Sequence, residues 1–157
     1  MRERARILIV DDNEGIRKTL ATILQEEGYA VDTAKNGKEA IQKTHTEVYN
    51  LALIDIKLPD TEGTKLLTKM RETTPRMRKI IMTGYPTLQN AIEAVNKGAD
   101  AYVQKPFDME KTLETIAEQL RKQKEDVKYS ENKVTEFIET RVRELEEGKM
   151  VTRRKSR

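Results

Sequence analysis

The sequence contains no cysteine, and this absence removes several kinds of chemistry at once. Disulfide bonds, thiolate metal sites and cysteine nucleophiles are excluded. Long apolar runs are missing too, since no stretch approaches the roughly 18 apolar residues that a membrane-spanning helix needs. Strand-like residues follow the arginine-rich N-terminus directly, without the pattern of a cleaved signal peptide. We therefore expect a cytoplasmic protein with one main domain and no membrane contact.

The sequence also has a single histidine, and its basic and acidic residues nearly balance. The single histidine, His45, lies in a segment with the pattern of a surface helix; it could carry phosphate, but we favour an exposed structural residue. The net charge of +3 comes from residues 149–157, which hold five basic residues and no acidic ones. We expect this tail to be solvated and disordered, so nucleic-acid binding through it is only an alternative.

Short apolar runs are what the sequence does contain, and they alternate with helix-like segments. The runs are continuous rather than alternating, which is typical of a parallel sheet covered on both faces. They lie at residues 7–10, 51–54, 80–82 and 101–103, with a weaker run at 29–34. Helical periodicity marks residues 14–27, 36–46, 63–73 and 87–97, and Gly28 and Gly98 follow where helix ends are expected. The pattern predicts a doubly wound α/β fold.

The helical pattern continues beyond the last strand-like run. Asp108 can cap a helix whose apolar residues up to Leu120 would pack on the sheet. Beyond that point the chain becomes strongly polar and has no proline or glycine before Gly148. We therefore divide the chain into a domain at residues 1–120, a helical extension at 121–148 and the basic tail at 149–157.

Charged or hydroxyl side chains stand at the ends of four of the apolar runs. Asp11 and Asp12 follow the run at 7–10, Asp55 the run at 51–54 and Thr83 the run at 80–82, and Lys105 comes after the run at 101–103, separated from it by Gln104. In an open α/β sheet the carboxyl ends of the strands form the ligand-binding edge. Taken alone, each residue could have a purely structural role, as a helix cap, a turn residue or a solvated lysine. Their coincidence at one edge favours a functional site.

Three neighbouring carboxylates cannot all stay ionised without a cation between them. Oxygen ligands with open positions suit Mg²⁺, which favours phosphate as a further ligand. A carboxylate beside Mg²⁺ and a lysine can attack phosphorus, with both cations stabilising charge on the transferred group. Thr83 could donate a hydrogen bond to a phosphoryl oxygen.

The segments "LIVDDN", "LALIDIKLPDTEG", "IIMTGY" and "YVQKPF" together resemble the receiver domain of two-component response regulators, from about residue 5 to 120. The resemblance implies a flavodoxin-like fold, a five-stranded parallel sheet of order 2-1-3-4-5, here with a long C-terminal helical extension. Within that family the chain is most similar to nitrogen-regulator-type receivers. It has no G-x-x-x-x-G-K-[ST] loop and too few residues for a winged-helix domain, so we expect no dedicated output domain.

The resemblance also implies a role for each residue. Asp55 would accept a phosphoryl group from a sensor histidine kinase, with Lys105 and Thr83 binding that group. Asp11, Asp12, Asp55 and the main-chain carbonyl of Lys57 would hold Mg²⁺. Thr83 and Tyr102 would form the conformational switch, and the Lys105–Pro106 bond would be cis. Lys57 and Tyr85 would influence how readily water reaches the phosphoryl group.

We accordingly expect a phosphoprotein of a two-component system or phosphorelay, which signals to an unknown downstream protein through protein–protein contacts. It would not be an enzyme beyond its own phosphotransfer and dephosphorylation. The alternatives are a receiver-like scaffold that never accepts phosphate, DNA binding through the tail, and a phosphohydrolase with Asp55 as nucleophile. Such hydrolases usually place a second aspartate where this sequence has Lys57.

The helical extension carries a pattern of its own. Leu113, Leu120, Val127 and Val134 recur every seven residues, the interval of a left-handed coiled coil, although Gln123 and Ser130 interrupt the companion positions. A second stripe holds Val134, Ile138, Val142 and Leu145. We expect a weak homodimer through residues 108–147; a partner's helix or a frayed monomeric extension are the alternatives.

Overall fold

The computed structural model describes residues 4–84 and 87–155, with side chains described through residue 148. Within the described residues, strands and helices alternate from β1 to α5, as the sequence predicts. The elements are β1 (Arg6–Val10), α1 (Glu14–Glu26), β2 (Ala30–Ala34), α2 (Gly37–Thr46), β3 (Leu51–Asp55), α3 (Gly63–Thr73), β4 (Arg78–Thr83), α4 (Leu88–Asn96), β5 (Ala101–Gln104) and α5 (Met109–Lys155).

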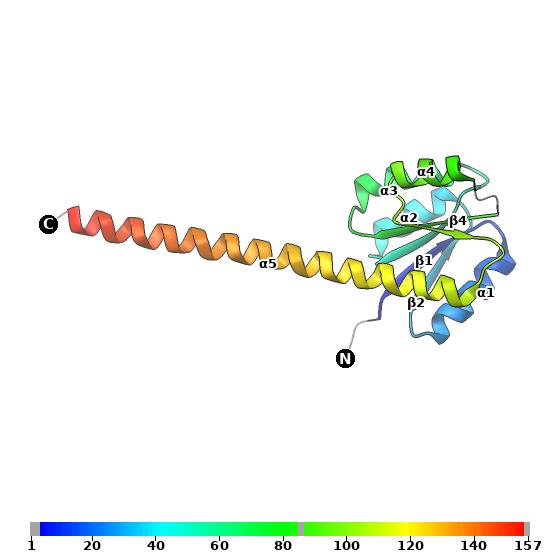
Figure 1. The fold of residues 1–157 in the computed structure, drawn as a ribbon, viewed down its shortest axis with the longest axis horizontal. Helices are drawn as coiled ribbons and strands as arrows, with labels where there is room; N and C mark the ends of the chain where they lie inside the picture. The colour runs from blue at the N-terminus through cyan, green and yellow to red at the C-terminus, as the bar shows by residue number, and fades with distance from the viewer. Residues whose placement is uncertain (1–3, 85–86, 156–157) are drawn as a thin grey trace. The chain divides into compact units, whose positions relative to one another are not determined.

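The strands form one parallel sheet in the order β2-β1-β3-β4-β5. The predicted flavodoxin-like, doubly wound fold is thereby confirmed (Figure 1). Residues 7–10 of β1 and 51–54 of β3 have no exposed surface at all, which explains why these runs are continuously apolar. The order reverses next to β1, so the carboxyl ends of β1 and β3 lie at the switch point where such sheets bind ligands.

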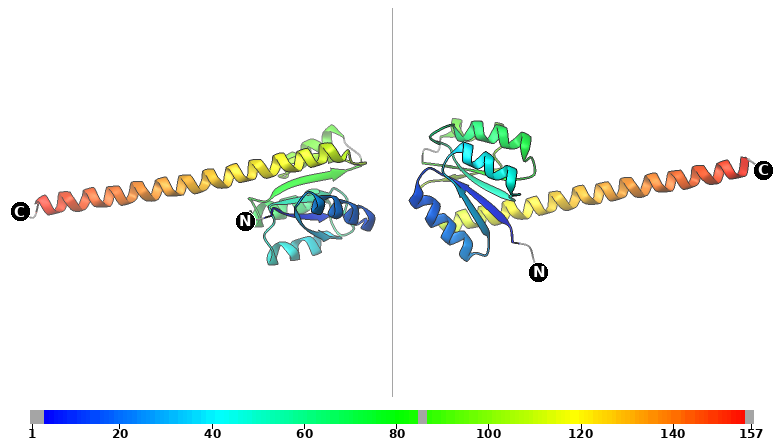
Figure 2. Two further views of the ribbon diagram at one scale, coloured as in Figure 1. Left: turned by 90° about the horizontal axis from the view of Figure 1, so that it is seen from below. Right: turned by 180° about the vertical axis from the view of Figure 1, so that it is seen from behind.

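Two apolar clusters hold the helices against the sheet. Leu20 and Leu24 of α1 and Ile116 of α5 belong to the cluster on one face. Leu66 and Leu67 of α3 lie in the cluster on the other face, together with residues of α2 and α4. The sheet is therefore covered on both sides (Figure 2). Leu113 and Leu120 pack against the first cluster, so these two members of the seven-residue pattern serve the core.

Local sequence signals fix the ends of most helices. The side chains of Asn13, Asn36 and Thr87 cap α1, α2 and α4, and Asp108 accepts a hydrogen bond from the N–H of Lys111 at the start of α5. Gly28 and Gly98 have φ values of 96° and 107°, as the C-terminal positions of α1 and α4 require.

The chain divides into two compact units, Met1–Gln123 and Lys124–Arg157, close to the predicted boundary at residue 120. The first unit extends to Gln123 because its side-chain amide donates to the carbonyl oxygens of Asn50 (2.8 Å) and Arg76 (3.0 Å). Helix α5 continues through residues 149–155, where no proline or glycine follows Gly148 to end it, and the disorder expected of the basic tail stays a prediction. Among the described residues, no helix has both the length and the apolar character needed to cross a bilayer.

Candidate functional site

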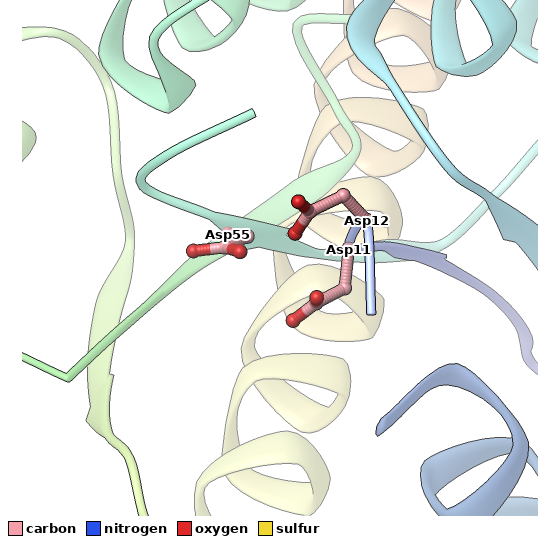
Figure 3. A group of neighbouring side chains, drawn as sticks. All are labelled: Asp11, Asp12 and Asp55. Carbon is pink, nitrogen blue, oxygen red and sulfur yellow. The ribbon is translucent and has the colours of Figure 1, made fainter. Parts of the chain in front are cut away.

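Three carboxylates meet at the carboxyl ends of β1 and β3. Asp11 and Asp12 follow Val10 directly, and Asp55 is the last residue of β3. One oxygen from each lies within 4.8 Å of the others (Figure 3). Asp11 is fully buried and Asp55 is 8% exposed, whereas Asp12 is exposed. A purely oxygen donor set that is open to solvent on one side fits a magnesium ion, which retains several waters.

Lys105 supplies the positive charge within this group. Its ammonium nitrogen lies 2.6 Å from Asp11 Oδ2 and 3.4 Å from Asp55 Oδ2. The N–H of Lys105 donates to the carbonyl oxygen of Thr83 (2.7 Å), which ties the end of β5 to the end of β4. The Lys105–Pro106 peptide bond is cis, as expected. Lys105 thus neutralises part of the charge of two carboxylates that would otherwise repel each other.

The ionised form of Asp55 remains electrostatically unfavourable in spite of the Lys105 ammonium. Burial raises the pKa of the Asp55 carboxyl, and the charge of Asp11 raises it further. The backbone N–H of Lys57, which donates to Asp55 Oδ1 at 3.2 Å, and the Lys105 ammonium lower the same pKa but do not offset the increase. Additional positive charge near Asp55 would therefore stabilise its ionised form.

Asp11 is held in place by contacts that the sequence pattern does not reveal. Its Oδ1 accepts a hydrogen bond from the N–H of Asn13 (2.9 Å). Its carbonyl oxygen accepts one from Nη1 of Arg17, at 2.8 Å, on the second turn of α1. Arg17 could not be identified from the sequence, because an arginine near the start of a helix carries no local signal of a partner six residues earlier.

The loop from Ile56 to Glu62 follows Asp55 and is fastened at both ends. Gly63 N–H donates to the carbonyl oxygen of Ile56 (2.7 Å), and Lys57 and Glu62 form an antiparallel bridge. Midway along the loop, the Asp60 carboxylate accepts hydrogen bonds from the N–H groups of Gly37 and Lys38 at the start of α2. These bonds lower the pKa of Asp60. The loop is thus connected to both flanking helices.

Thr83 lies on β4, the neighbour of β3, and Tyr102 lies on β5, the next strand along the sheet. Thr83 is fully buried at the end of β4 and lines a cavity of about 250 Å³ together with Lys57, Glu62 and Thr64. Tyr102 packs against the core, and its buried hydroxyl has no hydrogen-bond partner among the described residues. The cavity places free space next to Thr83, on the side of the loop that follows Asp55.

The structure therefore brings four of the expected residues into direct proximity: Asp11, Asp12, Asp55 and Lys105. Thr83 ends the neighbouring strand, so all five lie at the edge that the sequence predicts. His45 is exposed on α2, away from this edge. Tyr85 lies outside the described residues. The roles expected for these side chains stay predictions.

Comparison with known proteins gives a consistent result. The family model described as the response regulator receiver domain matches residues 7–117. Transcriptional regulatory protein ZraR of Klebsiella oxytoca is 34% identical over 134 residues, which is 85% of this chain and 29% of that protein. Transcriptional regulatory protein PhoP of Escherichia coli K12 is 31% identical over 117 residues, 74% of this chain and 52% of that protein. The chain thus spans well under two thirds of these two relatives.

Solved structures agree with these relatives. A CheY-like response regulator receiver domain protein from Methanospirillum hungatei JF-1 is 46% identical, with a TM-score of 0.76, and the match covers 79% of this chain and 99% of that one. The beryllofluoride-activated NtrC4 receiver domain dimer is 36% identical, with a TM-score of 0.72, over 75% of this chain and 98% of that one.

Proposed function

Because the chain belongs to the response regulator receiver domain family, we propose that Asp55 accepts a phosphoryl group from a phosphohistidine of a sensor kinase. In this step a carboxylate oxygen of Asp55 forms a bond to phosphorus while the phosphorus–nitrogen bond breaks. The imidazole leaves with the electron pair of that bond and takes up a proton. The observation that carries the proposal is the position of Asp55 beside Asp11, Asp12 and the Lys105 ammonium.

Each neighbouring residue has a distinct task in that step. Asp11, Asp12, Asp55 and the main-chain carbonyl of Lys57 would hold Mg²⁺, which supplies positive charge to the phosphoryl oxygens and to the ionised Asp55. Lys105, now 3.4 Å from Asp55 Oδ2, turns its ammonium to the transferred group. The Thr83 hydroxyl donates to a phosphoryl oxygen. The reaction modifies the chain itself, so we do not assign it the turnover of an enzyme.

Phosphorylation then shifts an equilibrium between two conformations of the receiver. Thr83 moves toward the phosphoryl group, which changes the cavity beside it. Tyr102 responds by a change in packing on β5, where its hydroxyl is already buried without a partner among the described residues. The altered face is read by a downstream protein, by a second copy of the chain, or by both.

Phosphorylation of the full chain with acetyl phosphate tests this function. In the presence of Mg²⁺ we expect intact-mass spectrometry to show one added phosphoryl group. Chelation with EDTA should abolish the reaction, because Asp11, Asp12 and Asp55 would then repel the incoming phosphate. Undiminished labelling in EDTA, or several phosphoryl groups per chain, would contradict the proposal.

Lys105 and Asp12 should have separable effects on metal binding. Asp12→Ala removes a metal ligand, so we expect the affinity for Mg²⁺ to fall roughly tenfold or more. Lys105→Ala should bind Mg²⁺ at least as tightly as the unsubstituted chain, because a competing cation 2.6 Å from Asp11 is gone. That variant should nevertheless accept phosphate poorly and fail to switch.

Isothermal titration calorimetry with Mg²⁺ measures both affinities. Lys18→Ala is the matched control, since Lys18 is exposed on α1 and pairs with Glu14. The assignment of the two residues is reversed if Lys105→Ala loses Mg²⁺ while Asp12→Ala retains it.

We also propose that the chain associates weakly with itself through α5. The structure leaves only the later part of α5 available for this association, because Leu113, Ile116 and Leu120 lie in or against the core of the first unit. The remaining apolar residues belong to the second unit, residues 124–157. Support comes from five large apolar side chains that stay exposed on this part of α5: Val134, Phe137, Ile138, Val142 and Leu145.

A further inference from the structure

The loop between β3 and α3 folds back on itself like a small hairpin. Lys57 and Glu62 form an antiparallel bridge at its base. One step further along, the N–H of Leu58 donates to the carbonyl oxygen of Thr61 at 3.2 Å. The loop therefore has a defined shape, with its base at the end of β3 and its tip at residues 59–60.

The tip of this loop is attached to the first turn of α2. Asp60 Oδ1 accepts a hydrogen bond from the N–H of Gly37, and Asp60 Oδ2 accepts one from the N–H of Lys38, both at 2.9 Å. Thr61 packs on the same turn, because a Cβ atom on Gly37 would lie 2.6 Å from Thr61 Cγ2 and 3.3 Å from Asp60 Oδ1. The loop and the helix thus fit closely enough to exclude a side chain at residue 37.

The base of the same loop reaches the acidic site. The N–H of Lys57 donates to Asp55 Oδ1 at 3.2 Å. The carbonyl of Lys57 and the N–H of Leu58 belong to one planar peptide unit, so fixing the direction of that N–H also fixes the direction of the carbonyl. The N–H is fixed by Thr61, which directly follows Asp60 in the chain. A short series of contacts therefore connects the Lys57 carbonyl to the start of α2.

We propose that Asp60 is a positioning residue of the metal site, which holds the Lys57 carbonyl in place by anchoring the loop to α2. This inference rests on the proposed function, which assigns that carbonyl to Mg²⁺, and adds a residue that contacts neither the metal nor the phosphoryl group. A backbone segment that is already ordered loses less conformational entropy when it supplies a ligand. The affinity for Mg²⁺ should therefore depend on the contact between Asp60 and α2.

A purely structural role for Asp60 makes a different prediction. A carboxylate that accepts from first-turn N–H groups stabilises a helix, and its loss would then weaken α2 without affecting the metal site. Asn36 provides the matched comparison, because its Oδ1 caps the same helix by accepting from the N–H of Glu39 at 2.8 Å. Asn36→Ala removes a cap of α2 but leaves the hydrogen bonds of Asp60 in place.

The charge of Asp60 offers a third explanation, since any carboxylate near the site attracts a cation. Gly37→Ala separates charge from position. It keeps the carboxylate, the φ angle of Gly37 is one that alanine adopts, and alanine favours the helix. Its Cβ atom nevertheless requires Asp60 and Thr61 to move away. If position matters, this variant should also bind Mg²⁺ more weakly.

Isothermal titration calorimetry of the full chain with Mg²⁺ compares the three variants. We expect Asp60→Ala to weaken binding roughly fivefold and Gly37→Ala to weaken it in the same direction. Asn36→Ala should bind Mg²⁺ like the unsubstituted chain. In the reaction of Asp60→Ala with acetyl phosphate, the Mg²⁺ concentration for half-maximal rate should rise by the same factor. The maximal rate should fall much less.

Amide hydrogen exchange, followed by NMR, tests the loop without any metal. In EDTA, Asp60→Ala and Gly37→Ala should speed exchange at Lys57 and Leu58, whose N–H groups are bonded within the site and the loop. In the unsubstituted chain, Mg²⁺ should slow exchange at Gly37 and Lys38, because a coupling between two sites is reciprocal.

Each outcome bears on the inference. Weaker Mg²⁺ binding and faster loop exchange in Asp60→Ala and Gly37→Ala, but not in Asn36→Ala, support it. A loss of affinity in Asp60→Ala alone overturns it in favour of charge. An equal loss in Asn36→Ala overturns it in favour of helix stability, and unchanged affinity in all three variants overturns it outright. If the unsubstituted chain binds Mg²⁺ with this pattern but accepts no phosphate, the proposed phosphotransfer fails and the positioning role stands.

Discussion

Asp55→Asn should abolish phosphorylation by acetyl phosphate and, in the absence of metal, increase the free energy of unfolding. The first effect follows because the amide is not a nucleophile, and because Asp55 combines some exposed surface with contact to Lys105, whereas Asp11 is fully buried. The second follows because burial and Asp11 raise the pKa of Asp55, so the ionised form is less favourable in the folded state than in the unfolded chain.

The pH dependence of this effect has a definite sign. A carboxyl group whose pKa is raised by folding stabilises the folded state while it is protonated, and that contribution is lost as the pH rises through the folded-state pKa. The unsubstituted chain and Asp55→Asn should therefore have similar stability below the ordinary carboxyl pKa of about 4. Above it, the variant should become the more stable of the two.

Urea unfolding in EDTA at several pH values measures this difference, and intact-mass spectrometry measures the phosphorylation. Asp60→Asn is an informative control, because hydrogen bonds from Gly37 and Lys38 lower the pKa of Asp60. It should keep the phosphoryl acceptor but lose stability at neutral pH, the opposite sign. Labelling of Asp55→Asn at the normal level would show that Asp55 is not the acceptor, and a loss of stability in EDTA would show that folding does not disfavour its ionised form.

Gly63→Ala should be the most destabilising single methyl group that can be added near the site. A Cβ atom on Gly63 would lie 2.4 Å from the carbonyl oxygen of Asp55 and 2.8 Å from Cα of Ile56. Both are backbone atoms, one of them in the fully paired strand β3, so neither can move aside cheaply. We expect a loss of roughly 3 kcal/mol in the free energy of unfolding, together with slower phosphorylation because the backbone of Asp55 is displaced.

Gly148→Ala is the matched control, since a Cβ atom there meets nothing within 4 Å and alanine favours the helix. Chemical denaturation of the first unit should be unchanged in this control. If Gly63→Ala unfolds at the same denaturant concentration as the unsubstituted chain, the close approach of α3 to Asp55 does not limit the packing.

Strand ends and helix caps were predictable because their signals are local. The continuous run before Asp11 and the apolar residues before Asp55 identify buried strands, and the parallel sheet then brings their ends together. Asn13 and Gly28 mark the two ends of α1 in the same way. The fold and the position of the acidic edge therefore follow from residues that act on their immediate neighbours.

Hydrogen bonds between side chains and backbone groups elsewhere in the chain could not be predicted in this way. The Arg17 side chain donates to the carbonyl oxygen of Asp11. The Asp60 carboxylate accepts from two backbone N–H groups at the start of α2, 22 and 23 residues earlier in the chain. The Gln123 side chain donates to carbonyl oxygens in the loops before β3 and β4. Polar side chains of these types are equally common on solvated surfaces, so only the completed fold selects their partners.

The Lys105 ammonium, 2.6 Å from Asp11 and 3.4 Å from Asp55, already acts as a counter-ion of the acidic site, so a metal ion would have to exchange with it. The chain carries its own counter-ion on a flexible tether, which keeps the carboxylates compatible with folding before any divalent ion arrives. A metal bound to these carboxylates would displace that counter-ion, and the displaced ammonium would stay within reach of a phosphoryl group on Asp55. Under the proposed function, the same exchange would therefore set both the metal affinity and the readiness for the phosphoryl group.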